Sequence, residues 1–145
     1  MPTYVVRFYK LKISNKQKAK IAQVITNVHS KTTGANTFFA QVIFEQTKKN
    51  NHYMGGKSVK TKEIFVNGQI RSGRPTHIKK NLILGLRNGL EKVLDLKKEN
   101  IWIYIEDLIP EQMIEYGEIL PKSGKEKIWF NKLSTSLKRK LKKLE

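Results

Sequence analysis

Residues 3–45 predict the fold, and they read TYVVRFYKLKISNKQKAKIAQVITNVHSKTTGANTFFAQVIFE. The segment Thr3–Tyr9 is rich in β-branched and aromatic residues, which indicates a strand. Ser14 and Gln17 have the spacing of a capping box, which predicts the start of a helix, and Gly34 marks its end. Between these signals, apolar residues recur at helical spacing and predict one buried face: Ile21, Val24, Ile25 and Val28.

A strand, a helix and a strand therefore follow one another, and the same order recurs in the second half of the chain. The first unit ends with the predicted strand Phe38–Glu45. The second unit has predicted strands at Glu63–Ile70 and Ile101–Ile105. A helix between them begins at Pro75, at a position that tolerates its missing N–H group. Its apolar stripe consists of Ile78, Leu82, Leu86, Leu90, Val93 and Leu94.

Helical crossovers of this length favour parallel pairing of the strands that they join. We therefore expect an α/β fold of the α+β-layer type, with tandem units at about residues 2–46 and 63–107. The units should form one four-stranded sheet, parallel within each unit, with both helices on one face. Gly85 and Gly89 are expected to let the second helix approach the sheet closely. The helix-free face then needs cover from a partner subunit or from the C-terminal segment. Since the run Ile101–Ile105 does not alternate, we expect both faces of that strand to be covered.

The rest of the chain is more polar. Residues 47–62 contain asparagines and glycines, which predicts a loop or hairpin. Pro110 is expected to begin a short third helix in the stretch EQMIEYGEIL. Residues 122–145 carry nine basic and two acidic residues, and their leucines could form the stripe of a short basic helix. We expect a single domain over residues 1–121, followed by this basic extension.

Composition excludes several kinds of site. The chain has 145 residues and no cysteine, which excludes disulfides and zinc–thiolate sites. Its net charge of +17 favours a nucleic-acid partner at first sight. However, only five of the 29 basic residues are arginine, the residue that bidentate recognition favours. No apolar run approaches the ~20 residues of a membrane span, and early lysines interrupt any signal peptide. We therefore expect a cytoplasmic protein with no membrane partner.

Pro2 directly precedes the first predicted strand. Initiator methionine is normally removed before a small second residue, and Pro2 would then carry a free secondary amine. Such an amine titrates near the α-amino reference of ~7.7–8.0, so it can act as a general acid or base near neutral pH. The strand behind it would hold it in place.

A chain with Pro2 ahead of two such units resembles the tautomerase superfamily. Within it, the chain is similar to the fused-subunit enzymes related to cis-3-chloroacrylic acid dehalogenase. The resemblance runs through PTYVV, ITNVHSKTTG, FFAQVIF, GG, IFVNGQIRSGR, IWIYIED, QMIEYGEILPKSG and WFNKLS. It implies a tautomerase-like fold, a homotrimer and chemistry without a cofactor or metal. The family's functional positions fall on six residues: Pro2, His29, Arg71, Arg74, Tyr104 and Glu115.

The resemblance implies that three of these residues bind the substrate, a small anionic carboxylic acid. Arg71 and Arg74 flank Gly73, where a sharp bend allows two guanidinium groups to grip one carboxylate. His29, at the end of the first predicted helix, would help to hold the same carboxyl group. The other histidines, His52 and His77, do not have the spacing of metal ligands.

The remaining three residues are implied to be catalytic. Glu115 and Tyr104 would orient and deprotonate a water molecule, and a cationic Pro2 would protonate the α-carbon. The outcome is hydration, or hydrolytic dehalogenation of a cis-3-haloacrylate-like acid. A neutral Pro2 could instead carry out enol–keto tautomerisation, and the sequence leaves this choice open.

Two other classes of function are also open. The chain could be an inactive relative, or a module that binds nucleic acid or another polyanion through residues 122–145. Trp129 and Phe130 precede the densest lysines and do not alternate with them, which argues against nucleic acid.

Overall fold

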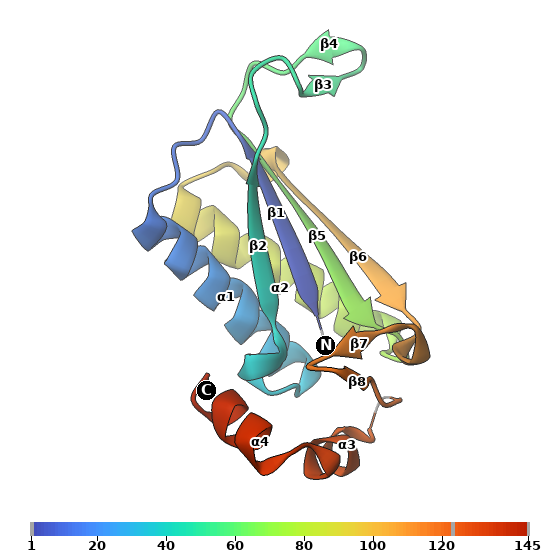
Figure 1. Cartoon of the computed structure of the whole chain (residues 1–145). Coiled ribbons are helices and arrows are strands. Elements are labelled where there is room, and N and C mark those ends of the chain that lie inside the picture. Colours follow the sequence, from blue (N-terminus) through green and yellow to red (C-terminus); the bar gives the residue numbers. More distant parts are fainter. Residues whose placement is uncertain (1, 123, 145) are drawn as a thin grey trace.

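The computed structural model describes residues 2–122 and 124–144. Its centre is one four-stranded sheet with the strand order β2-β1-β5-β6 (Figure 1). The two pairs β1·β2 and β5·β6 are parallel, and β1 is antiparallel to β5. The predicted fold class is therefore confirmed, as a mixed sheet that is parallel within each unit. The strands are β1 (Thr3–Tyr9), β2 (Gln41–Gln46), β5 (Glu63–Arg71) and β6 (Ile101–Leu108).

Two long helices, α1 (Asn15–Thr33) and α2 (Thr76–Leu94), cover one face of the sheet (Figure 1). The core lies between the helices and this face. It contains alternate residues of the two central strands and the stripes of both helices: Tyr4, Val6, Phe8, Ile64, Val66, Ile70, Ile21, Ile25, Leu82, Leu86 and Leu90. The predicted capping box is present, since the side chain of Ser14 accepts from the backbone N–H of Gln17 and the reverse bond also forms. Gly34, at φ 73°, ends α1 as predicted.

The glycines of α2 face the other helix and not the sheet, so the expectation about their partner was wrong. A Cβ atom added to Gly85 would lie 2.8 Å from Val28 Cγ1. One added to Gly89 would lie 2.4 Å from Val24 Cγ1. The missing side chains therefore let α1 and α2 pack against each other more closely than Cβ atoms would allow.

The C-terminal segment, which is the part of the chain after β6 (from residue 109 on), packs against the end of the sheet at which β1 begins (Figure 1). After the short 3₁₀ helix η3 (Pro110–Gln112) come β7 (Ile114–Glu115) and β8 (Glu118–Ile119), which form a hairpin. The helix predicted from Pro110 is therefore wrong. Tyr116 at φ 54° and Gly117 at φ 85° form the two-residue turn of the hairpin, a conformation that ends any helix.

Two short helices follow this hairpin, α3 (Glu126–Lys132) and α4 (Thr135–Lys142). They bury Trp129, Leu133 and Leu141 in a second apolar cluster, together with Leu120 and two phenylalanines from the loop before β2. Those phenylalanines, Phe38 and Phe39, lie in the 3₁₀ helix η1 (Thr37–Phe39). The second strand therefore begins at Gln41 and not at Phe38, because both neighbouring rings point into the cluster and cannot alternate between faces.

At the opposite end of the sheet, residues 47–62 form the predicted hairpin, with β3 (Tyr53–Met54) paired to β4 (Lys57–Ser58) (Figure 1). A further 3₁₀ helix, η2 (Lys98–Asn100), leads into β6. Within the described part of the chain, no helix combines the length and the apolar character needed to cross a membrane.

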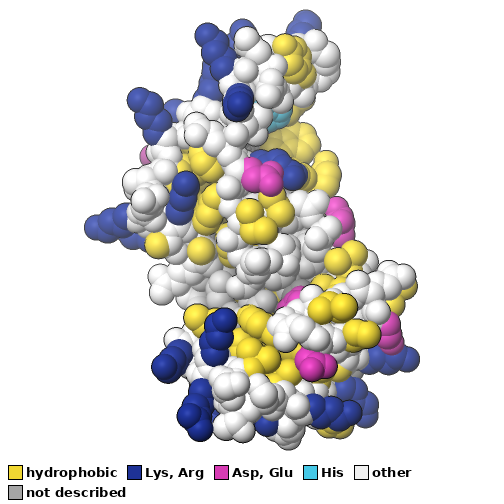
Figure 2. Space-filling view, in the orientation of Figure 1, with side chains coloured by type: hydrophobic (Ala, Val, Ile, Leu, Met, Phe, Trp, Pro, Cys, Tyr) yellow, Lys and Arg dark blue, Asp and Glu magenta, His cyan; other side chains and the backbone are white. Residues whose placement is uncertain are grey.

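Among the described residues of the protomer, no helix or strand covers the second face of the sheet. Trp102 is 39% exposed and Tyr104 54% exposed, so the expectation that both faces of this strand are covered fails within one chain. Ile43 on β2 is also exposed. Figure 2 shows hydrophobic side chains over the strands, together with polar ones and an adjacent basic and acidic side chain, while most lysine and arginine side chains lie around the edges of this view. The C-terminal segment lies at the end of the sheet, so it does not provide the cover.

Candidate functional site

Pro2, Arg71 and Arg74 line one small cavity at the end of the sheet. The strand order explains why they meet. Since β1 and β5 are antiparallel neighbours, with Thr3 paired to Gln69, the start of β1 lies beside the end of β5. Pro2 is buried there. The other lining residues come from the α1–β2 connection and the C-terminal segment: Ala35, Phe39, Leu120, Pro121, Glu126 and Trp129.

Arg71, the last residue of β5, is only 4% exposed. Its Nη1 donates to the carbonyl oxygen of Pro121 at 2.9 Å, and its Nη2 forms an ion pair with Glu126 Oε1. Its Nε is buried and has no hydrogen-bond partner within the described residues. Glu126 is not among the site residues predicted from the sequence. The available signal was that it is the single acidic residue in the basic segment 122–144.

Arg74 lies in the connection between β5 and α2. Its Nη1 donates to the carbonyl oxygen of Arg71 at 2.7 Å, which fixes the two arginines relative to each other. Burial lowers the pKa of Arg74, and the positive charge of Arg71 adds to that shift. Two cations held this close together form a favourable place for an anion.

His29, in the last turns of α1, is 2% exposed. Its Nδ1 is hydrogen-bonded to the hydroxyl of Tyr4 at 2.7 Å. Burial and the nearby charge of Arg74 lower the pKa of His29 to about 3, so the ring is neutral near pH 7. Burial also raises the pKa of Tyr4, which therefore keeps its proton. When that hydroxyl donates to Nδ1, the proton of the neutral ring lies on Nε2. Nε2 is buried and has no hydrogen-bond partner in the part of the chain that the structure describes.

Tyr4 itself is held by a glycine in the neighbouring strand. Gly68 pairs with Tyr4 across the two central strands. A Cβ atom at Gly68 would lie 2.5 Å from Tyr4 Cε1, so the phenol ring occupies space that a side chain would otherwise fill. This contact fixes the hydroxyl that orients His29, and neither Tyr4 nor Gly68 was predicted to have such a role.

Glu115 lies on β7 and is half-buried. Burial raises the pKa of its carboxyl group, and the positive charge of Arg71 opposes that shift. The Tyr116 hydroxyl donates to the carbonyl oxygen of Phe38 at 3.0 Å, which ties the hairpin to the loop before β2. Glu115 is therefore placed near Arg71 by a hairpin and not, as expected, by a helix.

Tyr104 is not brought together with Pro2, Arg71 and Arg74 within one protomer. It lies on the open face of β6, opposite Asn67, and is 54% exposed. Its ring packs edge-to-face on Phe65, with 5.2 Å between the ring centroids. Like His29 and Glu115, Tyr104 is absent from the described lining of the cavity that contains Pro2.

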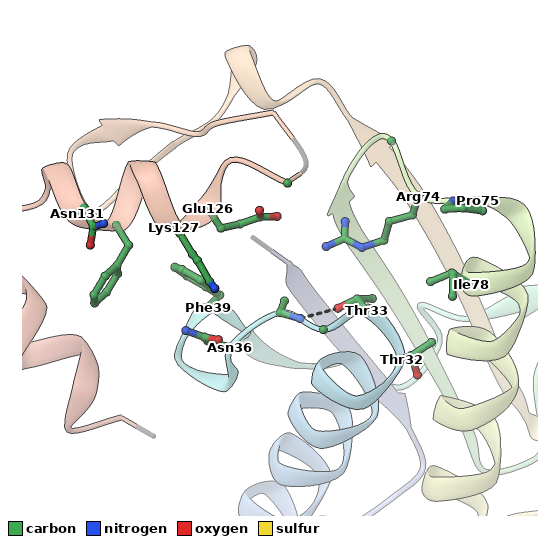
Figure 3. A pocket seen from close by; sticks show the side chains of 15 residues that line it. Thr32, Thr33, Asn36, Phe39, Arg74, Pro75, Ile78, Glu126, Lys127 and Asn131 are labelled. Atoms are coloured by element: carbon green, nitrogen blue, oxygen red, sulfur yellow. Dashed lines mark hydrogen bonds between the residues drawn. The ribbon is translucent and has the colours of Figure 1, made fainter.

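The small cavity, of about 10 Å³, adjoins a larger one of about 620 Å³. Both are lined by Ala35, Phe39, Arg74 and Glu126. The larger cavity extends between the end of α1, the start of α2 and α3 (Figure 3). Figure 3 shows the side chains of Arg74 and Glu126 pointing toward one another across it. The two cavities together can admit a small acid and hold its anionic end at the arginines. Among the described residues, no cluster of three or more histidines and carboxylates could hold a metal ion.

Comparisons with known proteins identify the family and the fold of the chain. The model of a family described as "Putative oxalocrotonate tautomerase enzyme" matches residues 1–133. A solved structure described as N1, a member of the cis-3-chloroacrylic acid dehalogenase family, is 30% identical, with a TM-score of 0.93. That alignment covers 97% of this chain and 99% of the other. A search of curated proteins found no significant match.

More distant structures share the fold. Native fused 4-OT is 19% identical with a TM-score of 0.74, and the alignment covers 81% of this chain and 94% of that one. A structure described as a Q0 fused 4-OT symmetric trimer is 16% identical with a TM-score of 0.73 and the same coverage.

Proposed function

Since this chain belongs to the oxalocrotonate-tautomerase family whose model spans residues 1–133, we propose that it is an enzyme that moves a proton at carbon in a small carboxylic acid. The proton carrier is the secondary amine of Pro2, which removal of Met1 would expose. One observation carries the proposal: Pro2 lines the same cavity as Arg71 and Arg74. A basic amine beside two carboxylate-binding groups can act on the carbon atoms next to a bound carboxylate.

The arginines and His29 bind the substrate carboxylate. Guanidinium groups bind carboxylates through charge-assisted and often bidentate hydrogen bonds. The neutral His29 ring, with its proton on Nε2, adds a donor without a further positive charge. Drawing electron density toward the carboxylate makes the β-carbon of an unsaturated acid electrophilic, which prepares it for attack by water.

Glu115 acts as the base for that water. Burial raises the pKa of its carboxyl group, which makes the carboxylate a stronger base for a bound water. The water oxygen bonds to the β-carbon, Glu115 takes the proton that the water loses, and cationic Pro2 donates a proton to the α-carbon. The result is hydration. If the β-carbon carries a halogen, the adduct loses hydrogen halide and becomes an aldehyde. The likeness to a member of the dehalogenase family supports this reaction.

Enol–keto tautomerisation is the second candidate, and the description of the matching family favours it. In this reaction a neutral Pro2 moves a proton between oxygen and carbon, and Glu115 is not needed as a base for water. The pKa of the Pro2 amine separates the two reactions. A value well above neutral keeps Pro2 cationic and favours hydration, and a value at or below neutral favours tautomerisation.

We further propose that the protein is a homotrimer that packs through the open face of the sheet. The exposed apolar side chains on that face support this assembly, and some of the fused 4-OT structures are described as trimers. Within one protomer Tyr104 is remote from Pro2. If Tyr104 orients the water, it does so in the cavity of a neighbouring protomer, and the assembly is then needed for catalysis.

A substrate panel on Met1-processed protein tests the proposal. The panel contains cis- and trans-3-haloacrylates, an acetylenic three-carbon acid and an enolised aryl pyruvate. Each acid is compared between the wild type and Pro2→Ala. We expect at least one acid to be turned over, and Pro2→Ala to lose at least about 100-fold in kcat/KM. Glu115→Gln should lose activity on the haloacrylate or acetylenic acid and retain tautomerisation. Turnover that is unchanged in Pro2→Ala would refute the proposal.

A further inference from the structure

Every hydrogen bond that Arg71 donates from its side chain goes to the C-terminal segment, as far as the described residues show. Its Nη1 reaches the carbonyl oxygen of Pro121, and its Nη2 is paired with Glu126. Its Nε, although buried, has no partner in this part of the chain. Nε and Nη2 together form the edge of a guanidinium that can take both oxygens of one carboxylate. Glu126 occupies only the Nη2 position of this edge, through its Oε1 atom.

Glu126 stands between the two cavities and lines both of them. It is the first residue of α3, and its side chain is 38% exposed, in contrast to the 4% of Arg71. In Figure 3 its carboxylate points toward Arg74 across the larger cavity. Burial acts to raise the pKa of this carboxyl group, but the backbone N–H groups at Glu126 and Gly124 and the charge of Arg71 outweigh it and hold the pKa below its ordinary value. Glu126 is therefore ionised near neutral pH.

We propose that Glu126 determines the substrate affinity and specificity of this site, as an internal carboxylate that occupies Arg71 in the empty enzyme and is displaced when the substrate carboxylate binds. The inference rests on the proposed function, since it takes Arg71 to be a substrate-binding residue. A bidentate substrate carboxylate gives partners to both Nε and Nη2, whereas Glu126 serves only Nη2. The larger cavity, of about 620 Å³, offers room for the displaced side chain.

This arrangement has a consequence for specificity. With Glu126 in place, Arg71, Arg74 and Glu126 carry a net charge of +1, so a weakly bound anion meets one unpaired cation and not two. An acid whose carboxylate grips Arg71 along one edge can replace Glu126. An anion that makes a single contact gains too little to do so. The residue therefore favours carboxylates over small spherical anions, at the expense of overall affinity.

Steady-state kinetics on Glu126→Gln test the proposal, together with the inhibition constant of propanoate, a non-reactive acid. Glutamine keeps the shape of the side chain and removes its charge. We expect KM and the propanoate constant each to fall about fivefold, as removal of one partly exposed ion pair predicts, with kcat within about twofold of the wild type. The matched control is Glu111→Gln, which removes an exposed carboxylate 3.7 Å from Lys122 in the same segment and should change neither constant.

If Glu126 only supports the fold around Arg71, the same variant will loosen the site, and KM and the propanoate constant will rise or stay unchanged. Either result overturns the inference. Glu126→Ala provides a second variant with the same expected direction, and a thermal melt of each variant verifies that it is folded. Direct binding of propanoate, followed by NMR, does not depend on turnover. If binding tightens in Glu126→Gln but no acid shows Pro2-dependent turnover, the inference stands and the proposed function fails. If Pro2-dependent turnover is found with no tightening, the proposed function stands and the inference fails.

Discussion

Replacement of His29 by glutamine should make the protein less sensitive to acid. His29 is 2% exposed, and burial, with the charge of Arg74, lowers its pKa from 6.5 to about 3. Between these two values the unfolded chain binds a proton at His29 and the folded chain does not. The free energy of unfolding therefore falls as the pH falls through 6.5. Between about pH 8 and about pH 5, this one group should remove about 2 kcal/mol of stability.

Urea unfolding at these two pH values measures the effect. Glutamine fills similar space and can still bond to the Tyr4 hydroxyl, but it does not titrate. The wild type should lose about 2 kcal/mol more than His29→Gln on going to the lower pH. Other groups that titrate in this range are common to both proteins, so their contributions cancel in the difference. His77→Gln, at an exposed histidine, is the matched control and should show the full wild-type loss. Equal losses in the wild type and His29→Gln would refute the account of a buried neutral imidazole.

Three further predictions concern the contact between α1 and α2, the binding of the substrate carboxylate by Arg74, and the open face of the sheet. Gly89→Ala should destabilise the protein by about 1–3 kcal/mol in urea unfolding, despite the better helix propensity of alanine, and Val24→Ala in the same chain should recover much of the loss. An unchanged stability would show that the two helices are not in close contact. Arg74→Gln should raise KM at least about tenfold with a smaller change in kcat, because it removes a charge-assisted contact to the substrate; an unchanged KM would rule out this anchor. Trp102→Lys should dissociate the proposed trimer in sedimentation equilibrium, and a trimer that withstands this charge would place the interface elsewhere.

Much of the fold can be predicted from local signals. The bounds of β1 follow from a β-rich run, and those of α1 follow from a capping box at its start and a glycine at its end. All of these signals act within a few residues. The stretch from Pro110 was misassigned because its apolar spacing also fits a helix. The turn at Tyr116 and Gly117 is a hairpin signal only if a positive φ at tyrosine is expected, and that is uncommon. The burial of Phe38 depends on contact with α3, far away in the sequence.

The candidate site likewise has a part that the sequence predicts and a part that it does not. Pro2, Arg71 and Arg74 could be grouped in advance from their residue types and the family pattern, and the antiparallel pairing of β1 and β5 places them around one cavity. The pairing of Arg71 with Glu126 joins residues 55 positions apart, and no local pattern predicts such a contact. The resemblance to the family places Tyr104 among the site residues, but within a single chain Tyr104 lies on the open face of the sheet. Contacts made by tertiary packing or by assembly are therefore the part that the sequence alone does not reveal.

The central claim is that the amine of Pro2 carries the proton, and one comparison tests it most directly. Met1-processed protein is compared with the same protein bearing one extra residue before Pro2, with intact mass confirming each amino terminus. The two proteins share every side chain of the site, but in the second the Pro2 nitrogen is an amide and cannot accept a proton near neutral pH. The account predicts that kcat/KM falls at least about 100-fold while propanoate still binds. Equal kcat/KM values for the two proteins would contradict it.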